Sequence, residues 1–178
     1  MAYHHLALAT RDMQKTHDFY EGVMGFELVK VEVAPVSTGG WGKHFFYRMD
    51  GDDSRFIAFW SLHDVPGQED MVFDLNAAGK LPPMTNHFSF SVSTKQELEE
   101  KRQIWLDAGL DVFEIDHNWC HSIYTSDPDG NAVEFCLTTG AFTGADRDKA
   151  LETLAATKFQ PSPEPAMMKF WQADKSDA

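Results

Sequence analysis

Three side chains have the types and the positions that a metal site requires: His5, His87 and Glu134. Each histidine opens a short alternating stretch, "HLALAT" or "HFSFSVS", and the glutamate stands inside the apolar run "NAVEFCL". Two imidazoles and one carboxylate leave coordination positions open, an arrangement that suits non-haem Fe(II). A single histidine in a strand usually makes only ordinary hydrogen bonds. The metal hypothesis therefore depends on the predicted strands that carry these three residues and on where those strands point them.

The chain contains an internal repeat. The stretches "HHLALATRDMQKTHDFYEGVMGFELVKVE" and "HFSFSVSTKQELEEKRQIWLDAGLDVFEID" each have the pattern of a strand, a helix, a glycine and a second strand. Gly25 and Gly109 stand where a helix C-terminal glycine belongs. The sequence therefore predicts an α+β fold of two βαβββ modules, at about residues 1–64 and 84–140, with the two leading histidines at equivalent positions.

The strand pleat decides where the three side chains point, because strand residues two apart share a face. Large apolar residues alternate with the three candidates and should pack under the helices. The candidates themselves should point into roomier, concave faces, and burying a carboxylate there without a partner would cost several kcal/mol. Metal binding explains all three positions together. The small residues that share their faces are Ala7, Ala9, Ser89, Ser91, Ala132 and Cys136.

The glutamate belongs to a predicted hairpin. Asp127-Pro128-Asp129-Gly130 is the signature of a type I turn, with Asp first, Pro second and Gly fourth. The flanking stretches 122–126 and 131–137 carry the alternating and β-branched residues of paired strands.

Bulk properties exclude several classes of protein. The 178 residues carry a formal charge of −13, which argues against nucleic acid and anionic membranes, because phosphate binding needs clustered Lys and Arg. The two cysteines, Cys120 and Cys136, are too few for a disulfide framework, and no apolar stretch has membrane-spanning length. We expect a soluble cytoplasmic protein.

The last part of the chain, residues 141–178, has a different pattern. A helix is expected at about 146–157, followed by the proline-rich stretch "QPSPEPAMMKFWQ", which should be extended. Its apolar residues should dock on the same domain or on a second subunit, so a homodimer is expected.

The paired modules, the opening "HHLALATRD" and the close "YTSDPDGNAVEF" resemble the vicinal oxygen chelate superfamily over roughly residues 3–140. The resemblance implies an incomplete barrel around a metal, with His5, His87 and Glu134 as ligands. His4 competes with His5 for the first place, but only His5 stands seven residues before Asp12, as the family pattern has it. The superfamily includes glyoxalase I, methylmalonyl-CoA epimerase, fosfomycin-resistance transferases, bleomycin-resistance binders and type I extradiol dioxygenases.

Within the superfamily, the closest resemblance is to the extradiol dioxygenases. Glyoxalase I and the epimerases take a fourth ligand, Glu or Gln, at a place where this chain has Ile57 or Ala58. The dioxygenase signature is similar to Ile115-Asp116-His117, Ile123-Tyr124, the Pro-Gly turn and Glu134 here. The resemblance implies Fe(II) and O2 acting on a catechol-like aromatic substrate. Tyr124 would then bond to a substrate oxygen and His117 would act as an acid–base group.

Other readings stay open at this point. Extradiol enzymes have a further active-site histidine near the place of Arg55, and His63 or His44 could substitute for it from another position. Tyr124 could instead be a core aromatic residue. The alternative functions are a glyoxalase-like lyase or isomerase using Mn, Zn, Ni or Co, and a non-catalytic small-molecule-binding protein.

Overall fold

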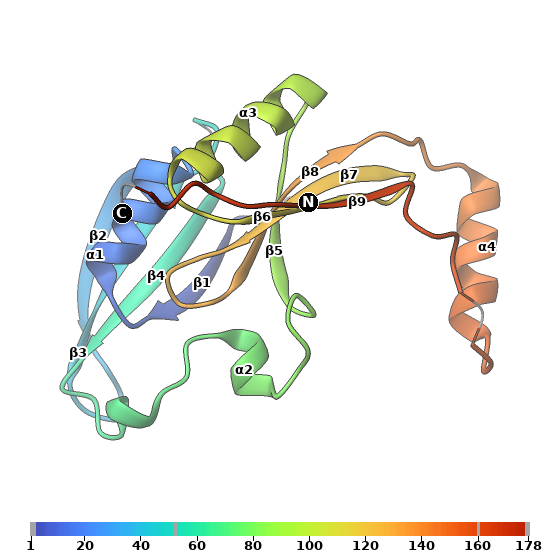
Figure 1. Ribbon diagram of the computed structural model, residues 1–178. Helices are drawn as coiled ribbons and strands as arrows, with labels where there is room; N and C mark the ends of the chain where they lie inside the picture. The colour runs from blue at the N-terminus through green and yellow to red at the C-terminus, as the bar shows by residue number, and fades with distance from the viewer. Residues whose placement is uncertain (1–2, 52, 160, 177–178) are drawn as a thin grey trace. The chain divides into compact units, whose positions relative to one another are not determined.

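The computed structural model describes residues 3–51, 53–159 and 161–176. Two compact units make up the chain: Met1–His87 with Ser126–Ala132, and Phe88–Thr125 with Val133–Ala178. The described residues form a four-stranded sheet in the order β1-β4-β3-β2 and a five-stranded sheet in the order β5-β8-β7-β6-β9 (Figure 1). Neither sheet closes on itself and helices are few, so the predicted α+β class is confirmed.

The first module follows the predicted order of a strand, a helix and three strands. The Asp12 side chain caps its helix by accepting the backbone N–H groups of Gln14 and Lys15. The α-helix then continues as a π-helix, with i→i+5 hydrogen bonds, and ends before Gly25. The φ of Gly25 is 78°, a value that suits glycine. The elements are β1 (His5–Thr10), α1 (Met13–His17), the π-helix η1 (Asp18–Val23), β2 (Glu27–Pro35), β3 (Trp41–Arg48) and β4 (Phe56–His63).

Aromatic side chains form the core of this unit on the helix-facing side of the sheet. The ring of Tyr20 lies 4.5 Å from that of Phe59, centroid to centroid, and both residues are buried with Phe45 and Tyr47. The Tyr20 hydroxyl donates a hydrogen bond to Oδ2 of Asp127 in the hairpin turn, at 3.1 Å. Each buried ring of this size contributes about 1.5–3 kcal/mol by leaving water.

The second module repeats the same order of elements. Its helix begins at the Thr94 cap and buries Leu98 and Trp105, the apolar positions of its stripe. Two short helices, η2 (Gln68–Asp70) and α2 (Leu75–Gly79), precede the module in the chain. Its elements are β5 (His87–Ser91), α3 (Lys95–Asp107), β6 (Val112–Asp116), β7 (Cys120–Ser126) and β8 (Ala132–Thr138).

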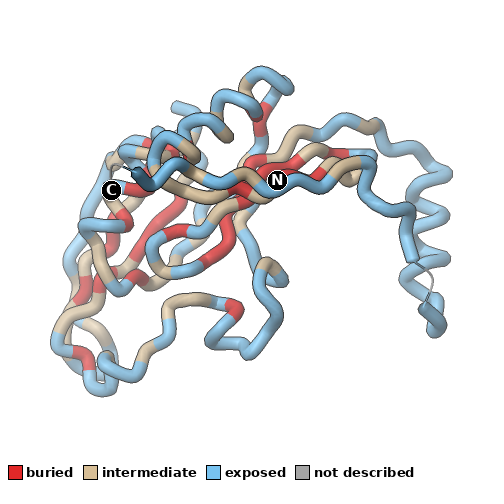
Figure 2. The backbone as a smooth tube through the Cα atoms, viewed as in Figure 1, coloured by how far each residue is buried: buried red, intermediate tan, exposed pale blue. Residues whose placement is uncertain are grey.

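After the second module come the predicted C-terminal helix and extended tail. Helix α4 (Gly144–Ala155) starts at a capping box of Thr143 and Asp146, and all its residues are exposed (Figure 2). Strand β9 (Met167–Trp171) pairs antiparallel with β6. In the described parts of the chain, no helix is long and apolar enough to cross a membrane.

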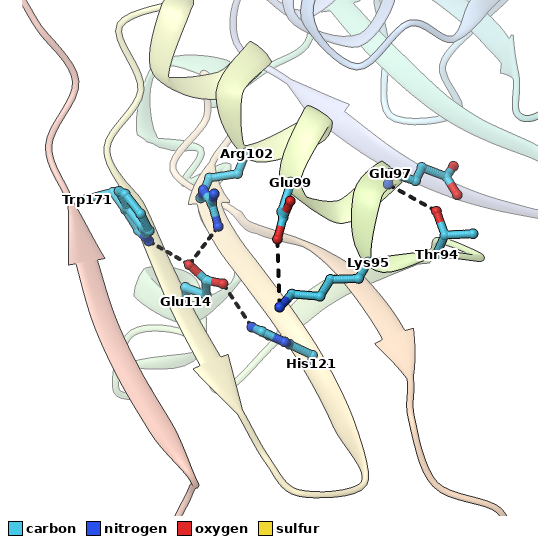
Figure 3. Close-up of polar contacts among 8 residues, drawn as sticks. All are labelled: Thr94, Lys95, Glu97, Glu99, Arg102, Glu114, His121 and Trp171. Atoms are coloured by element: carbon cyan, nitrogen blue, oxygen red, sulfur yellow. Dashed lines mark hydrogen bonds and ion pairs between the residues drawn. The ribbon is translucent and has the colours of Figure 1, made fainter.

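A buried carboxylate fixes this added strand. Glu114 on β6 accepts hydrogen bonds from Arg102 of α3 at 3.0 Å and from the indole N–H of Trp171 at 2.6 Å. Its other oxygen lies 2.8 Å from Nε2 of His121 on β7 (Figure 3). The guanidinium of Arg102 also lies over the Trp171 ring, 4.2 Å from its centroid. One side chain thus joins a helix and three strands.

Candidate metal centre

His5 lies at the first position of β1, where its side chain is exposed. Its Nδ1 is 2.8 Å from Nδ1 of His4, so the two imidazoles share a hydrogen bond. A metal-ligating histidine commonly has its second ring nitrogen held by a hydrogen bond, which fixes the tautomer and the ring orientation. With Nδ1 of His5 as the donor, its Nε2 would keep a lone pair for a metal and His4 would orient the ring; the choice of His5 over His4 as the ligand stays a prediction.

One ring nitrogen of His87 is held by a backbone carbonyl group. Its Nδ1 lies 3.0 Å from the carbonyl oxygen of Met84, so Nδ1 carries the proton and donates it. The proton is then absent from Nε2 in the neutral ring, and Nε2 is the nitrogen with a lone pair for a metal. The chemistry of both predicted histidines fits a metal ligand.

Glu134 is buried in β8 with 4% of its surface exposed. In the β7–β8 hairpin the backbone N–H of Asp127 donates to the carbonyl of Asn131 at 2.9 Å. This register sets Tyr124 directly opposite Glu134 on the same face. The Tyr124 hydroxyl hydrogen-bonds to Glu134, and it also lies 3.1 Å from Nε2 of His117. Three of the predicted site residues are thus gathered.

Burial raises the pKa of Tyr124 above its usual value, and the charge of Glu134 raises it further. The phenol is therefore protonated at neutral pH and keeps a hydrogen to donate. Tyr124 is buried and its hydroxyl is hydrogen-bonded, as expected both of a core aromatic residue with a satisfied hydroxyl and of a site residue, so its catalytic role stays a prediction.

The full triad of His5, His87 and Glu134 stays a prediction. The two histidines belong to the first unit and the glutamate to the second. Across residues 3–51, 53–159 and 161–176, no three His, Cys, Asp or Glu side chains are gathered as they would be around an ion.

The register of the first sheet separates Ile57 from Ala58, the two residues predicted at the place of a fourth ligand. His5 pairs with Phe56 and Ala7 with Ala58, so these four residues share one face. Ile57 points to the opposite side and is buried in the core. Ala58 therefore stands on the His5 face of β4, and it has no ligating atom.

The register also separates the two histidines that were left as alternatives. His44 pairs with Trp60, which pairs in turn with Ala9, so His44 lies on the His5 face. His63 pairs with Trp41 on the other face, where the two rings stack at 4.1 Å beside a cavity of about 580 Å³. Burial, and then the imidazole of His5, lower the pKa of His44.

Sequence reasoning missed an aromatic floor on the His5 face, formed by Phe46, Phe56 and Trp60. His44 stacks on Trp60 with ring centroids 4.1 Å apart and an interplanar angle of 13°, and it also lies 4.1 Å from the Phe46 ring. Phe46 in turn lies 5.8 Å from the His5 ring. The alternation in "HFF" and "FIAFW" carried this signal, but the pairing of the two strands was needed to see it.

The two cysteines were also not expected to meet. Cys120 and Cys136 are neighbours on the same face of the second sheet as Glu134. Burial, chiefly, and then the neighbouring Cys136 raise the pKa of Cys120 to about 11. The sulfur of Cys120 is therefore a thiol at neutral pH.

Comparison with known proteins places these features in a family. Residues 2–135 match the model of the Glyoxalase/Bleomycin resistance protein/Dioxygenase superfamily. A Bacillus subtilis (strain 168) protein named "Probable trivalent organoarsenical cleaving enzyme" is 27% identical over 144 residues, covering 78% of this chain and 81% of that protein.

Solved structures share the fold. A glyoxylase/bleomycin resistance protein/dioxygenase domain from Frankia sp. EAN1pec is 18% identical, with a TM-score of 0.59 over 78% of this chain and 98% of that one. A variant of the Listeria monocytogenes fosfomycin resistance protein, complexed with Mn(II), is 18% identical, with a TM-score of 0.53 over 84% and 97% of the two chains. With paired βαβββ modules and a match over three quarters of its length, the chain belongs to the glyoxalase/bleomycin resistance protein/dioxygenase superfamily.

Proposed function

We propose that the protein is an Fe(II)-dependent dioxygenase that cleaves a catechol-like aromatic ring next to its diol. The observation that carries this proposal is the hydrogen-bonded series His117, Tyr124 and Glu134. In this series Glu134 supplies a carboxylate, which is the chemistry of a metal ligand. Tyr124 and His117 are two groups that can carry a proton. Such an arrangement suits a reaction in which protons leave a bound diol.

His5, His87 and Glu134 would hold the ion through Nε2, Nε2 and a carboxylate oxygen. The bound Fe(II) would supply two-point binding of the diol and activation of dioxygen. The protonated Tyr124 has one hydrogen, which it would turn from Glu134 to a substrate oxygen and so orient the ring. His117, bonded to that hydroxyl, would accept or return a proton through its Nε2.

The aromatic floor supports a flat substrate. Phe46, Phe56 and Trp60 share the face of His5, and each presents a ring or a ring edge there. Offset or edge-on contacts between aromatic rings are worth about 0.5–1.5 kcal/mol beyond the buried area. An aromatic diol would gain this term in addition to its bonds with the metal.

A lyase or isomerase of the glyoxalase kind is less well supported. Those enzymes resemble one another in a fourth ligand from the first module, and Ala58 occupies that place here. Three ligands leave enough positions for a diol and dioxygen together.

The test is a panel of catechols incubated in air with the Fe(II)-loaded protein, followed by oxygen uptake and visible absorbance. We expect oxygen uptake together with a yellow ring-fission product. No uptake with any catechol, together with Zn- or Ni-dependent turnover of a hemithioacetal, would move the protein to the lyase class.

The thiol pair favours a second candidate function, cleavage of the carbon–arsenic bond of a trivalent organoarsenical. On binding trivalent arsenic the two thiols would lose their protons and become thiolates, soft ligands that suit this soft centre. The Bacillus subtilis relative carries this activity in its name. The test is release of inorganic arsenite from a trivalent phenylarsenical by the Fe(II)-loaded protein. Release by the wild type and its loss in Cys120→Ser and Cys136→Ser, with iron retained, would select this reaction over ring cleavage.

A further inference from the structure

His44 carries a buried polar atom that the fold itself does not use. Only 8% of the residue is exposed, and its Nε2 has no hydrogen-bond partner among the described residues. A buried polar group without a partner costs about 1–3 kcal/mol, so native structures rarely keep one unless a ligand, an ion or a water satisfies it.

The ring's packing alone does not require a histidine. His44 lies between Phe46 and Trp60, with both ring centroids 4.1 Å away. A phenylalanine would stack there equally well and would bury no polar nitrogen. The imidazole therefore has a use that stacking does not explain.

The position of His44 indicates that use. It shares the face of His5, the predicted metal ligand, and the aromatic floor surrounds it. His63, the other histidine of this sheet outside β1, lies on the opposite face with Trp41 and bonds to Ser61 through Nε2 at 3.2 Å. Of these two histidines, His44 is the one on the His5 face.

We propose that His44 is a substrate-binding residue whose Nε2 hydrogen-bonds a polar oxygen of an aromatic ligand lying on the floor formed by Phe46, Phe56 and Trp60. This inference rests on the proposed function for the class of ligand.

The experiment is an anaerobic titration of the Fe(II)-loaded full-length protein with 4-nitrocatechol, followed by the visible absorbance of the ligand. His44→Phe should weaken binding by on the order of tenfold, the effect of one lost hydrogen bond. His44→Gln, whose amide nitrogen can reach the place of Nε2, should restore part of the affinity. His63→Phe is the matched control and should bind as the wild type does.

Thermal unfolding of the metal-free variants supplies the second readout. Because His44→Phe removes an unsatisfied polar atom and keeps the stack, its Tm should equal or exceed that of the wild type. A lowered Tm, wild-type affinity in His44→Phe, or equal weakening in His63→Phe would each overturn the proposal, as would a wild type that binds no catechol. Binding that depends on His44 without any oxygen uptake would reject the dioxygenase function and leave this inference standing.

Discussion

Removing the carboxylate of Glu114 should destabilise the second unit strongly. Its side chain is 6% exposed and accepts from Arg102 and Trp171, while its other oxygen contacts His121 (Figure 3). Glu114→Ala would leave the guanidinium, whose side chain is 19% exposed, without its carboxylate. Removing one partner of a buried ion pair lowers the free energy of unfolding by about 3–5 kcal/mol. Glu114→Gln keeps one acceptor oxygen and should cost about 1–3 kcal/mol.

The matched control is Glu99→Gln on the same helix. Glu99 pairs with Lys95 at 3.8 Å, and both side chains are largely in water, so its loss should change stability by less than about 1 kcal/mol. The free energy of unfolding in urea, followed by circular dichroism, measures all three variants. Equal stability of Glu114→Ala and Glu99→Gln would refute the view that this carboxylate holds β9 and α3 to the sheet.

Further predictions concern the site and one loop. Tyr124→Phe should keep one iron per chain and slow oxygen uptake, and His117→Ala should slow it more, by roughly 10²–10⁴-fold; unchanged rates in both variants would remove them from the reaction. Gly40→Ala should lower the Tm, because Gly40 has a φ of +74° and a Cβ there would lie 2.3 Å from the carbonyl oxygen of His63. Gly22→Ala, with nothing within 4 Å of the added Cβ, is its control and should unfold near the wild-type temperature.

Local patterns in the sequence predicted the strand faces well. The two-residue period placed Glu134 opposite the apolar side of β8, and the structure sets Val133 and Phe135 in the core. The capping box at Thr143 and Asp146 is visible as T-x-x-D, so the start of α4 could have been placed two residues earlier than 146. In each case the determining contact lies within a few residues of the chain.

Features that depend on distant pairing could not be predicted. The choice between His44 and His63 needed the register of β3 against β4, which no local pattern gives. The tail was expected to be extended, but its pairing with β6 depends on Trp171 meeting Glu114, 57 residues away. The π-helix η1 arises from a hydrogen bond between the N–H of Met24 and the carbonyl of Phe19, at 2.8 Å, inside a stretch expected to be an ordinary helix.

Metal content tests the central claim most directly. The protein is purified without added metal, reconstituted with Fe(II), and analysed for iron per chain alongside Glu134→Ala and the control Glu99→Gln. The metal assignment predicts one iron per chain in the wild type and in Glu99→Gln, and loss of bound iron in Glu134→Ala with an unchanged circular dichroism spectrum. Full iron occupancy in Glu134→Ala would contradict the assignment of His5, His87 and Glu134 as the metal ligands.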